Sequence, residues 1–285
     1  MPPGPAVLTG EPKECKGERN SLEGIQMEYA RMRLELDGPV GVVEFDRPPA
    51  NAYDLGFLEE LDQVVEEVRR RDDIKVLVLR GNDRFFSAGA DINIFLGASP
   101  EEIGKFALFG HLVLDRLERL PKISIAAITG HAMGGGLEIA LACDLRFMAQ
   151  GKAQLGLVEV KIGTLPNMGG TQRLPRLIGK ARALEMMVTG RTVGAEEALA
   201  LGLVNRVHPA DKLLPETLEY AKTLARGATL TIGLIKQCVN EGVEQPLASG
   251  VALERACGAV AFRSHDFKEG SKAFAEKRAP AFLGR

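Results

Sequence analysis

The amino-acid sequence predicts an α/β protein, and three observations favour that class. Short apolar runs typical of strands buried on both faces, at residues 76–79 and 123–128, alternate with longer stretches of helical periodicity. Hydrophobic residues make up 45% of the chain and charged residues 26%, which is usual for globular proteins. A chain of 285 residues can also bury a large core without disulfide or metal cross-links.

Patterned structure begins near Tyr29. Apolar and charged side chains alternate over residues 32–36, and an Asp37-Gly38 turn leads into a second strand, which predicts a β-hairpin. Pro48 and Pro49 end the hairpin, and a helix with one apolar face follows. The elements expected in this half are strands at 32–36, 40–45 and 76–79, a helix at 55–71, a loop at 80–90, a helix at 100–120 and a strand at 123–128.

The expected elements become shorter after residue 128. They are strands at 145–148, 153–156 and 204–207, and helices at 137–143, 171–178, 181–188 and 195–201. From residue 213 onward only helical patterns occur. We therefore expect a flexible extension over residues 1–28, an α/β core over 29–212 and a helical region over 213–285 that packs on a neighbouring subunit.

Charge and cysteine usage limit the partners and the cellular setting that we expect. The net charge of −2 gives no overall reason to bind nucleic acid or an anionic membrane. The four cysteines lack CxxC spacing and have few histidines nearby, so we expect no metal site and a reducing, cytoplasmic setting. No signal peptide or membrane-spanning segment is expected either.

Glycine is the unusual residue. It occurs 32 times, about 11% of the chain against a usual level of about 7%, and nine glycines fall between Gly130 and Gly170. Glycine is favoured where the backbone takes a positive φ or approaches another group closely. A cluster of glycines therefore predicts a site at which the backbone itself contacts a ligand.

Two glycine-containing segments could supply backbone donors. Residues 85–91 are small and follow a buried strand, so they form either a ligand-binding loop or a tight connection. Gly134–Gly136 precede a helix, where free N–H groups and the helix dipole favour an anion or a developing oxyanion. Neither a dinucleotide fingerprint nor a P-loop matches here. Glu138, in the first helical turn, is either a partner of the dipole or a catalytic group.

A third segment presents Glu159 among apolar neighbours between Gly156 and Gly163. A carboxylate in an apolar pocket tends to have a raised pKa and can act as a general acid. The alternative is an exposed glutamate, or one paired with Lys161 or Arg173. Ser87 is the only candidate nucleophile in these loops, and no histidine is spaced to serve as its base, so acyl transfer has little support.

Taken together, the three segments resemble the crotonase superfamily, most closely its enoyl-CoA hydratases. The residues that carry the resemblance are Phe86-Ser87-Ala88-Gly89-Ala90-Asp91, Gly134-Gly135-Gly136-Leu137-Glu138, and Gly163 to Pro166 with Gly169-Gly170-Thr171-Gln172-Arg173. The resemblance extends from about Tyr29 to the C-terminus. It implies a spiral of ββα units, a C-terminal helical region used for oligomerisation, and a homotrimer or homohexamer.

The resemblance also implies a reaction and a set of site residues. The reaction is the addition of water to a 2-enoyl-CoA thioester, a step of fatty acid β-oxidation, with no cofactor because CoA is part of the substrate. Glu138 and Glu159 would be the catalytic glutamates, Glu138 activating water and Glu159 donating the proton. The backbone N–H groups of Ala88 and Gly135 would form the oxyanion hole. Residues implied to bind CoA are Ala50, Ala52, Ala90, Asp91, Ile92 and Lys277.

The chain also departs from the family pattern. Asn93 stands where the family often has a lysine, and Asn167-Met168 stand where its hydratases usually have Gly-Ala. Both changes leave the substrate preference open to a greater degree than the type of reaction. A 3-enoyl to 2-enoyl-CoA isomerase remains an alternative, although it needs only one carboxylate. A non-catalytic RNA-binding relative is a further alternative, but the acidic face of the helix at 55–71 opposes phosphate binding.

Overall fold

Two β-sheets organise the part of the chain that the computed structural model describes, residues 27–285. The larger sheet has the strand order β1-β2-β3-β4-β6-β8-β10, and the smaller has the order β5-β7-β9. Pairing is antiparallel from β1 to β3 and parallel everywhere else. The strands are β1 (Met27–Glu28), β2 (Met32–Asp37), β3 (Val40–Phe45), β4 (Val76–Arg80), β5 (Phe85–Ser87), β6 (Ile123–Ile128), β7 (His131–Met133), β8 (Leu145–Ala149), β9 (Leu155–Gly156) and β10 (Arg206–His208).

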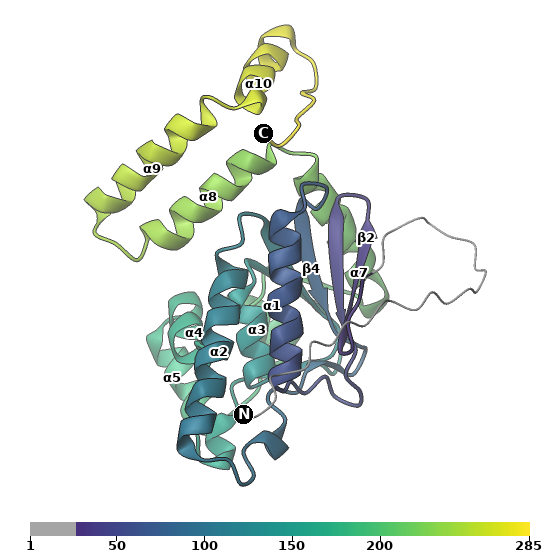
Figure 1. The fold of residues 1–285 in the computed structure, drawn as a ribbon, viewed down its shortest axis with the longest axis vertical. Coiled ribbons are helices and arrows are strands. Elements are labelled where there is room, and N and C mark those ends of the chain that lie inside the picture. Colours follow the sequence, from purple (N-terminus) through teal and green to yellow (C-terminus); the bar gives the residue numbers. More distant parts are fainter. Residues whose placement is uncertain (1–26) are drawn as a thin grey trace, which may run out of the picture.

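Helices surround the sheets and extend the chain beyond them (Figure 1). They are α1 (Leu55–Arg70), α2 (Pro100–Glu118), α3 (Gly135–Ala142), α4 (Gly170–Ile178), α5 (Lys180–Thr189), α6 (Ala195–Ala200), α7 (Ala210–Ala225), α8 (Thr229–Gly242), α9 (Leu247–Ala261) and α10 (His265–Glu276). Two short 3₁₀ helices, η1 (Ile92–Ile94) and η2 (Glu159–Ile162), follow strands of the small sheet.

A ββα unit repeats three times along the chain. In β4-β5-α2, β6-β7-α3 and β8-β9-α4, the first strand enters the large sheet, the second enters the small sheet and a helix follows. This arrangement is the ββα spiral that the sequence resemblance implied. Because the second strands lie side by side, the loops that follow them meet at one end of the small sheet.

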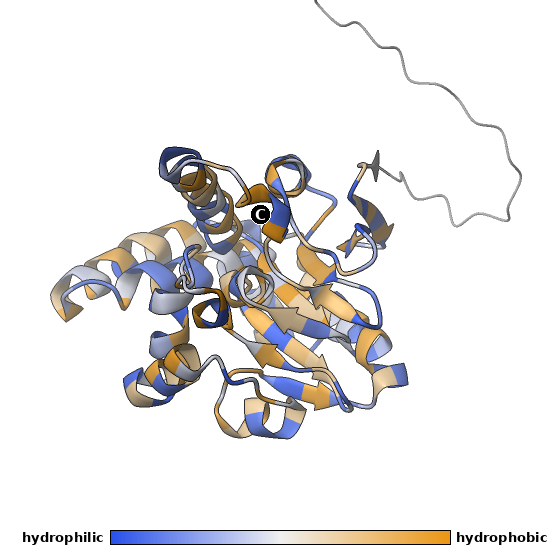
Figure 2. Ribbon diagram, turned by 90° about the horizontal axis from the view of Figure 1, so that it is seen from below, coloured by the Kyte–Doolittle hydropathy of each residue, from blue (hydrophilic) through white to orange (hydrophobic). Residues whose placement is uncertain are grey.

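The large sheet is buried on both faces, as its apolar runs predict. Leu77 and Leu79 of β4 share one hydrophobic core with the apolar face of α1, whereas Val76 and Val78 pack with Leu213 of α7 on the opposite face. Figure 2 shows apolar residues along the strands and a mixture of apolar and hydrophilic residues on the outer helices. Since α7 begins at Ala210 and covers the sheet, the expected boundary at residue 213 falls inside a core helix.

Several expected elements differ from the observed ones. The expected loop at 80–90 contains β5, and β7 was also missed, because a three-residue strand is too short to show a period. The last expected strand, at 204–207, forms at Arg206–His208. Met27–Glu28 pairs with β2, so strand pairing begins within the expected extension. Residues 1–26 of that extension lie outside the described residues.

The helices α8 to α10 project from the core (Figure 1) and carry many exposed apolar side chains. Leu247 is 83% exposed and Phe274 is 88% exposed. Exposed apolar surface of this extent is typical of an interaction surface. None of the helices in residues 27–285 is both long and apolar enough to cross a membrane.

Candidate active site

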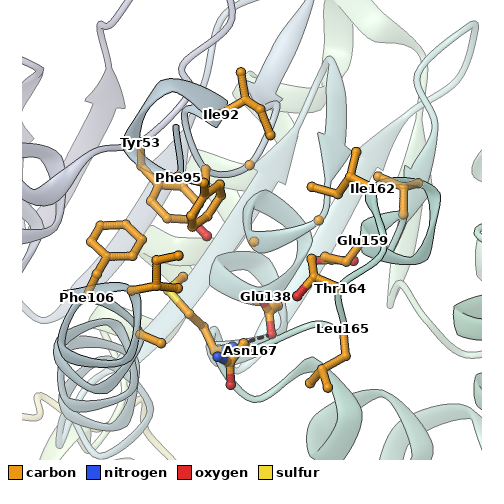
Figure 3. Close-up of a pocket in the computed structure, with 18 of the residues that line it drawn as sticks. Tyr53, Ile92, Phe95, Phe106, Glu138, Glu159, Ile162, Thr164, Leu165 and Asn167 are labelled. Carbon is orange, nitrogen blue, oxygen red and sulfur yellow. Dashed lines mark hydrogen bonds between the residues drawn. The ribbon is translucent and has the colours of Figure 1, made fainter. Parts of the chain in front are cut away.

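One cavity of about 440 Å³ gathers the three segments singled out in the sequence. Its wall includes the loop after β5, the start of α3 and the segment from Val158 to Met168, with side chains of α2 on the remaining side. Most of the lining is apolar. Figure 3 shows Glu138 and Glu159 facing this cavity, opposite the aromatic rings of Tyr53, Phe95 and Phe106.

Glu138 is held rigidly at the base of the cavity. It lies in the first turn of α3 and is only 2% exposed. Its Oε1 atom accepts hydrogen bonds from the backbone N–H groups of Met168 and Gly170, both at 2.7 Å. Burial raises the pKa of Glu138, while these two N–H groups favour the ionised form and oppose the shift. The carboxylate is therefore oriented by the backbone and is not a surface partner of the helix dipole.

Glu159 is held very differently. It begins η2, and both carboxylate oxygens are buried with no hydrogen-bond partner among the described residues. Burial raises its pKa to about 7, and the nearby Glu138 adds to the shift. The alternative partner Arg173 is paired with Glu118, at 2.6 Å, and no ion pair joins Lys161 to Glu159. A carboxyl group with this pKa can both release and take up a proton near neutral pH.

Two free backbone N–H groups point to an oxyanion site. Those of Ala90 and Gly135 make no hydrogen bond to another described residue, and both residues line the cavity. Gly135 is the first residue of α3, after Gly134 with φ 54°, so its N–H has no partner within the helix. Gly89, with φ 96°, brings the other loop close: a Cβ on Gly89 would lie 3.4 Å from the nitrogen of Gly135.

Ala88 does not fit the role expected from the resemblance. Its N–H donates to the carbonyl oxygen of Ala50 at 3.0 Å, so it is not free to bind a ligand. The unpaired N–H in this loop is that of Ala90, two residues further on, which lines the cavity with Gly135. Tyr53 explains the difference, because its backbone pairs with Gly89 and Asp91 and leaves the N–H of Ala90, on the other side, unpaired.

Ser87 and His131 form no nucleophile–base pair. The Ser87 hydroxyl donates to the carbonyl oxygen of Asn51 at 2.7 Å and accepts from the N–H of Gly89 at 3.2 Å. Nδ1 of His131 accepts from the N–H of Gln154 at 3.1 Å. The Ser87 hydroxyl therefore stabilises the loop beside the cavity, whereas His131 joins the starts of β7 and β9 and does not line the cavity, in agreement with the weak support for acyl transfer.

The residues expected to bind CoA lie in three parts of the structure. Ala90 and Ile92 line the cavity, and Ala50 and Ala52 lie in the neighbouring loop before α1. The carboxylate of Asp91 is paired with Arg47 at 2.9 Å, which lowers its pKa, and also bonds the N–H of Asn93. Lys277, exposed at the end of α10, is not part of the cavity wall, and its contact with CoA across a subunit boundary stays a prediction.

Tyr53 and Phe106 are site residues that the sequence did not single out. Tyr53 lies in the cavity wall with its ring stacked on Phe106, at a centroid distance of 6.0 Å and an interplanar angle of 13°. Phe106 belongs to α2 and is 53 residues away in the chain. In the sequence, only the position of Tyr53, an aromatic residue between Ala52 and the predicted helix, could have indicated that it belongs to the site.

Comparisons with known proteins give a consistent result. The enoyl-CoA hydratase/isomerase family model matches residues 35–285. Over 265 residues the chain is 39% identical to a probable enoyl-CoA hydratase of Mycobacterium tuberculosis, covering 91% of this chain and all of that one. It is 38% identical over 254 residues to the short-chain-enoyl-CoA hydratase of Clostridium acetobutylicum, covering 88% of this chain and 97% of that one. A solved enoyl-CoA hydratase of Geobacillus kaustophilus superposes with a TM-score of 0.90 at 41% identity, covering 92% of this chain and all of that one.

Proposed function

The chain belongs to the enoyl-CoA hydratase/isomerase family, and on that premise we propose that its cavity adds water reversibly to a 2-enoyl-CoA thioester, giving a 3-hydroxyacyl-CoA. One observation carries the proposal. Two buried carboxylates, Glu138 and Glu159, share a mostly apolar cavity with two unpaired backbone N–H groups, those of Ala90 and Gly135. Each of these four groups has a task in this reaction.

The N–H groups of Ala90 and Gly135 would bind the thioester carbonyl oxygen. When water attacks C3 of the enoyl group, electrons move through C2 to that oxygen and give an enolate. Donors that already point at this oxygen stabilise the new charge without reorganising, and losing one such donor typically costs about 3 kcal/mol. The N-terminus of α3 adds the positive end of its dipole.

The two glutamates would divide the proton transfers. Glu138 keeps its ionised form accessible through two N–H bonds to Oε1, which leaves Oε2 to accept a proton from the attacking water. Glu159, with a pKa of about 7, would carry the proton that is delivered to C2. General acid–base groups of this kind contribute about 10²–10⁴-fold each. In the reverse direction the same two groups exchange roles.

CoA enters this scheme as part of the substrate, so no separate cofactor is proposed. Ala50, Ala52, Ala90, Asp91, Ile92 and Lys277 remain the proposed contacts of its pantetheine and nucleotide portions. We also propose a homotrimer or homohexamer, supported by the exposed apolar side chains of α8 to α10. Light scattering coupled to size-exclusion chromatography would test the assembly, and a monomer at micromolar concentration would contradict it.

The test of the reaction is the loss of the conjugated enoyl-thioester absorbance when the protein is added to crotonyl-CoA. We expect Glu138→Gln and Glu159→Gln each to lower kcat at least 10²-fold while both variants stay folded. Glu216→Gln, on the exposed side of α7, is the matched control and should behave as the wild type. Normal turnover in both site variants would contradict the proposal. A protein that consumes only 3-enoyl-CoA would instead be an isomerase.

A further inference from the structure

The hydroxyl group of Tyr53 has no task in the reaction as proposed, yet it lies in the middle of the site. Tyr53 is 3% exposed and lines the cavity two residues before α1. Its N–H donates to the carbonyl oxygen of Gly89 and its carbonyl oxygen accepts from the N–H of Asp91, both at 2.9 Å. These bonds fix the backbone of Tyr53 beside Ala90, the first of the two proposed oxyanion donors.

The side chain of Tyr53 reaches the second donor. Its hydroxyl oxygen lies 1.8 Å from the position that a Cβ on Gly135 would occupy. A Cβ stands about 1.5 Å from its Cα, so the hydroxyl oxygen is within about 3.3 Å of the Gly135 Cα and about 5 Å of its nitrogen. An oxygen that accepts a hydrogen bond from this N–H lies about 2.9 Å from the nitrogen. A hydroxyl donor lies about 2.8 Å from its acceptor, so two donors no more than about 5 Å apart can bind one oxygen that lies between them.

The hydroxyl is held in place but has no hydrogen-bond partner among residues 27–285. The ring of Tyr53 is stacked on Phe106 and tilted against Phe57 at a centroid distance of 6.3 Å. The hydroxyl is not among the fully buried side-chain atoms that lack a partner, so it opens onto the cavity, from which water or a ligand can supply its hydrogen bond. Figure 3 shows the hydroxyl directed into the cavity. A fixed polar group without a protein partner, directed into a cavity, is available to a ligand that enters it.

The charges around Tyr53 decide which way it would bond. Burial raises the pKa of its hydroxyl well above the ordinary value, and the carboxylates of Glu138 and Glu159 raise it further. Tyr53 therefore keeps its proton throughout the working pH range. Toward an oxygen that is becoming negative, it can act only as a hydrogen-bond donor.

We propose that Tyr53 is a further catalytic residue, whose O–H donates a hydrogen bond to the thioester carbonyl oxygen beside the N–H groups of Ala90 and Gly135. This inference rests on the proposed hydration, because it needs an acyl-CoA thioester in the cavity. The bond strengthens as the oxygen gains charge, so it favours the transition state over the bound substrate. Tyr53 transfers no proton, and the proton balance of hydration stays with the two glutamates.

Tyr53→Phe tests the proposal, because it removes the hydroxyl and keeps the stacked ring. We expect kcat/KM for crotonyl-CoA to fall about 10–10²-fold, somewhat less than for the loss of an established oxyanion donor. Tyr220→Phe is the matched control: this tyrosine lies on α7 against Phe147, outside the cavity, and its variant should stay within twofold of the wild type. Thermal unfolding should show Tyr53→Phe to be as stable as the wild type or more stable, because its hydroxyl has no partner in the free protein.

A second measurement identifies the atom that Tyr53 contacts. Butyryl-CoA is saturated and cannot be hydrated, so isotope-edited infrared spectra of its ¹³C-labelled carbonyl report hydrogen bonding in the site. The carbonyl band should lie at higher frequency in Tyr53→Phe than in the wild type and be unchanged in Tyr220→Phe. An unchanged band in Tyr53→Phe, with or without loss of activity, would overturn the inference. If the wild type neither binds butyryl-CoA nor hydrates crotonyl-CoA, the proposed function itself fails.

Discussion

The carboxylate of Glu159 lies directly over Gly134: Oε1 is 3.0 Å from the position that a Cβ on Gly134 would occupy. Gly134 has φ 54° and stands immediately before α3, so Glu159 approaches the start of that helix without accepting a hydrogen bond from it. The carboxylate is thus desolvated, and this desolvation is the main cause of its raised pKa, with the nearby Glu138 adding to the shift and the backbone of Glu159 itself opposing it. Any side chain at residue 134 would displace it.

The first prediction concerns pH. If hydration needs Glu159 protonated and Glu138 ionised, kcat/KM should fall as Glu159 loses its proton and reach half of its maximum near pH 7. Hydration takes up no net proton, so kcat/KM for the reverse reaction should follow the same profile. The residual activity of Glu159→Gln should lack this decline, and Glu216→Gln should retain it. A wild-type profile that is flat from pH 6 to pH 9 would rule out Glu159 as the acid.

The second prediction separates Ala90 from Ala88 as an oxyanion donor. Replacing a residue by its α-hydroxy acid turns the amide into an ester and removes only the N–H. An ester at residue 90 should lower kcat about 10²–10³-fold with little change in the unfolding temperature, because that N–H has no partner in the protein. An ester at residue 88 should mainly lower stability, by about 1 kcal/mol, because it loses the bond to Ala50. If the ester at residue 88 lowered kcat and the ester at residue 90 lowered only stability, Ala88 would be the oxyanion donor.

The third prediction concerns Arg173 as a positioning residue. Its Nη1 donates to the carbonyl oxygen of Met168 at 3.0 Å, and its Nε and Nη2 bind Oε2 of Glu118 at 3.0 and 2.6 Å. It thereby holds the residue whose N–H orients Glu138. Arg173→Lys keeps the positive charge, but a lysine ammonium cannot contact Met168 and Glu118 together as the planar guanidinium does. Glu138 should then be oriented less well, so kcat should fall about tenfold with KM nearly unchanged.

Arg176→Lys is the control for Arg173, because Arg176 is exposed and pairs with Glu244 away from the cavity. Steady-state kinetics on crotonyl-CoA should leave its kcat within twofold of the wild type. A change in KM alone for Arg173→Lys would contradict a role in orienting Glu138.

The fourth prediction concerns chain length. The Met168 side chain, 3% exposed, closes one wall of the cavity, and its Sδ lies 2.2 Å from the position of a Cβ on Gly110 in α2. Met168→Ala should raise the kcat/KM ratio of 2-octenoyl-CoA to crotonyl-CoA at least tenfold, because a methylene in an apolar pocket contributes about 1–3 kcal/mol. Met186 lies in the core outside the cavity and serves as the control. Both Met168→Ala and Met186→Ala should lower the free energy of unfolding by about 2–5 kcal/mol, but Met186→Ala should leave the kcat/KM ratio unchanged.

The fifth prediction concerns Lys277. It has φ 56°, a conformation that asparagine tolerates, so Lys277→Asn removes the charge with little backbone strain. If Lys277 binds a phosphate of CoA, KM for crotonyl-CoA should rise about fivefold or more, while KM for crotonyl-N-acetylcysteamine, which lacks phosphates, stays the same. Lys272→Gln, five residues earlier and exposed on α10, is the control. An equal rise for both thioesters would exclude a phosphate contact.

The sequence by itself determined the α/β class and the main elements, and it singled out Glu138 and Glu159 as candidate site residues. Strands such as residues 76–79 and the amphipathic helix at 55–70 depend on local periodicity, which a single sequence displays directly. The glycines before α3 likewise predict a start with exposed N–H groups, because their conformational freedom is a local property. The spacing of the three motifs then indicated the family.

Only the tertiary structure decided which groups in the site are free. Whether the N–H of Ala88 or of Ala90 is unpaired depends on the bonds of residues 50 and 53 to this loop, which no local pattern records. Glu159 is unpaired because no donor of the described residues reaches its buried carboxylate. The position of the Tyr53 hydroxyl follows from its meeting Gly135 across 82 residues. Hydrogen bonds and desolvation act between segments that are close only after folding, so the chemistry of the site is a property of the fold.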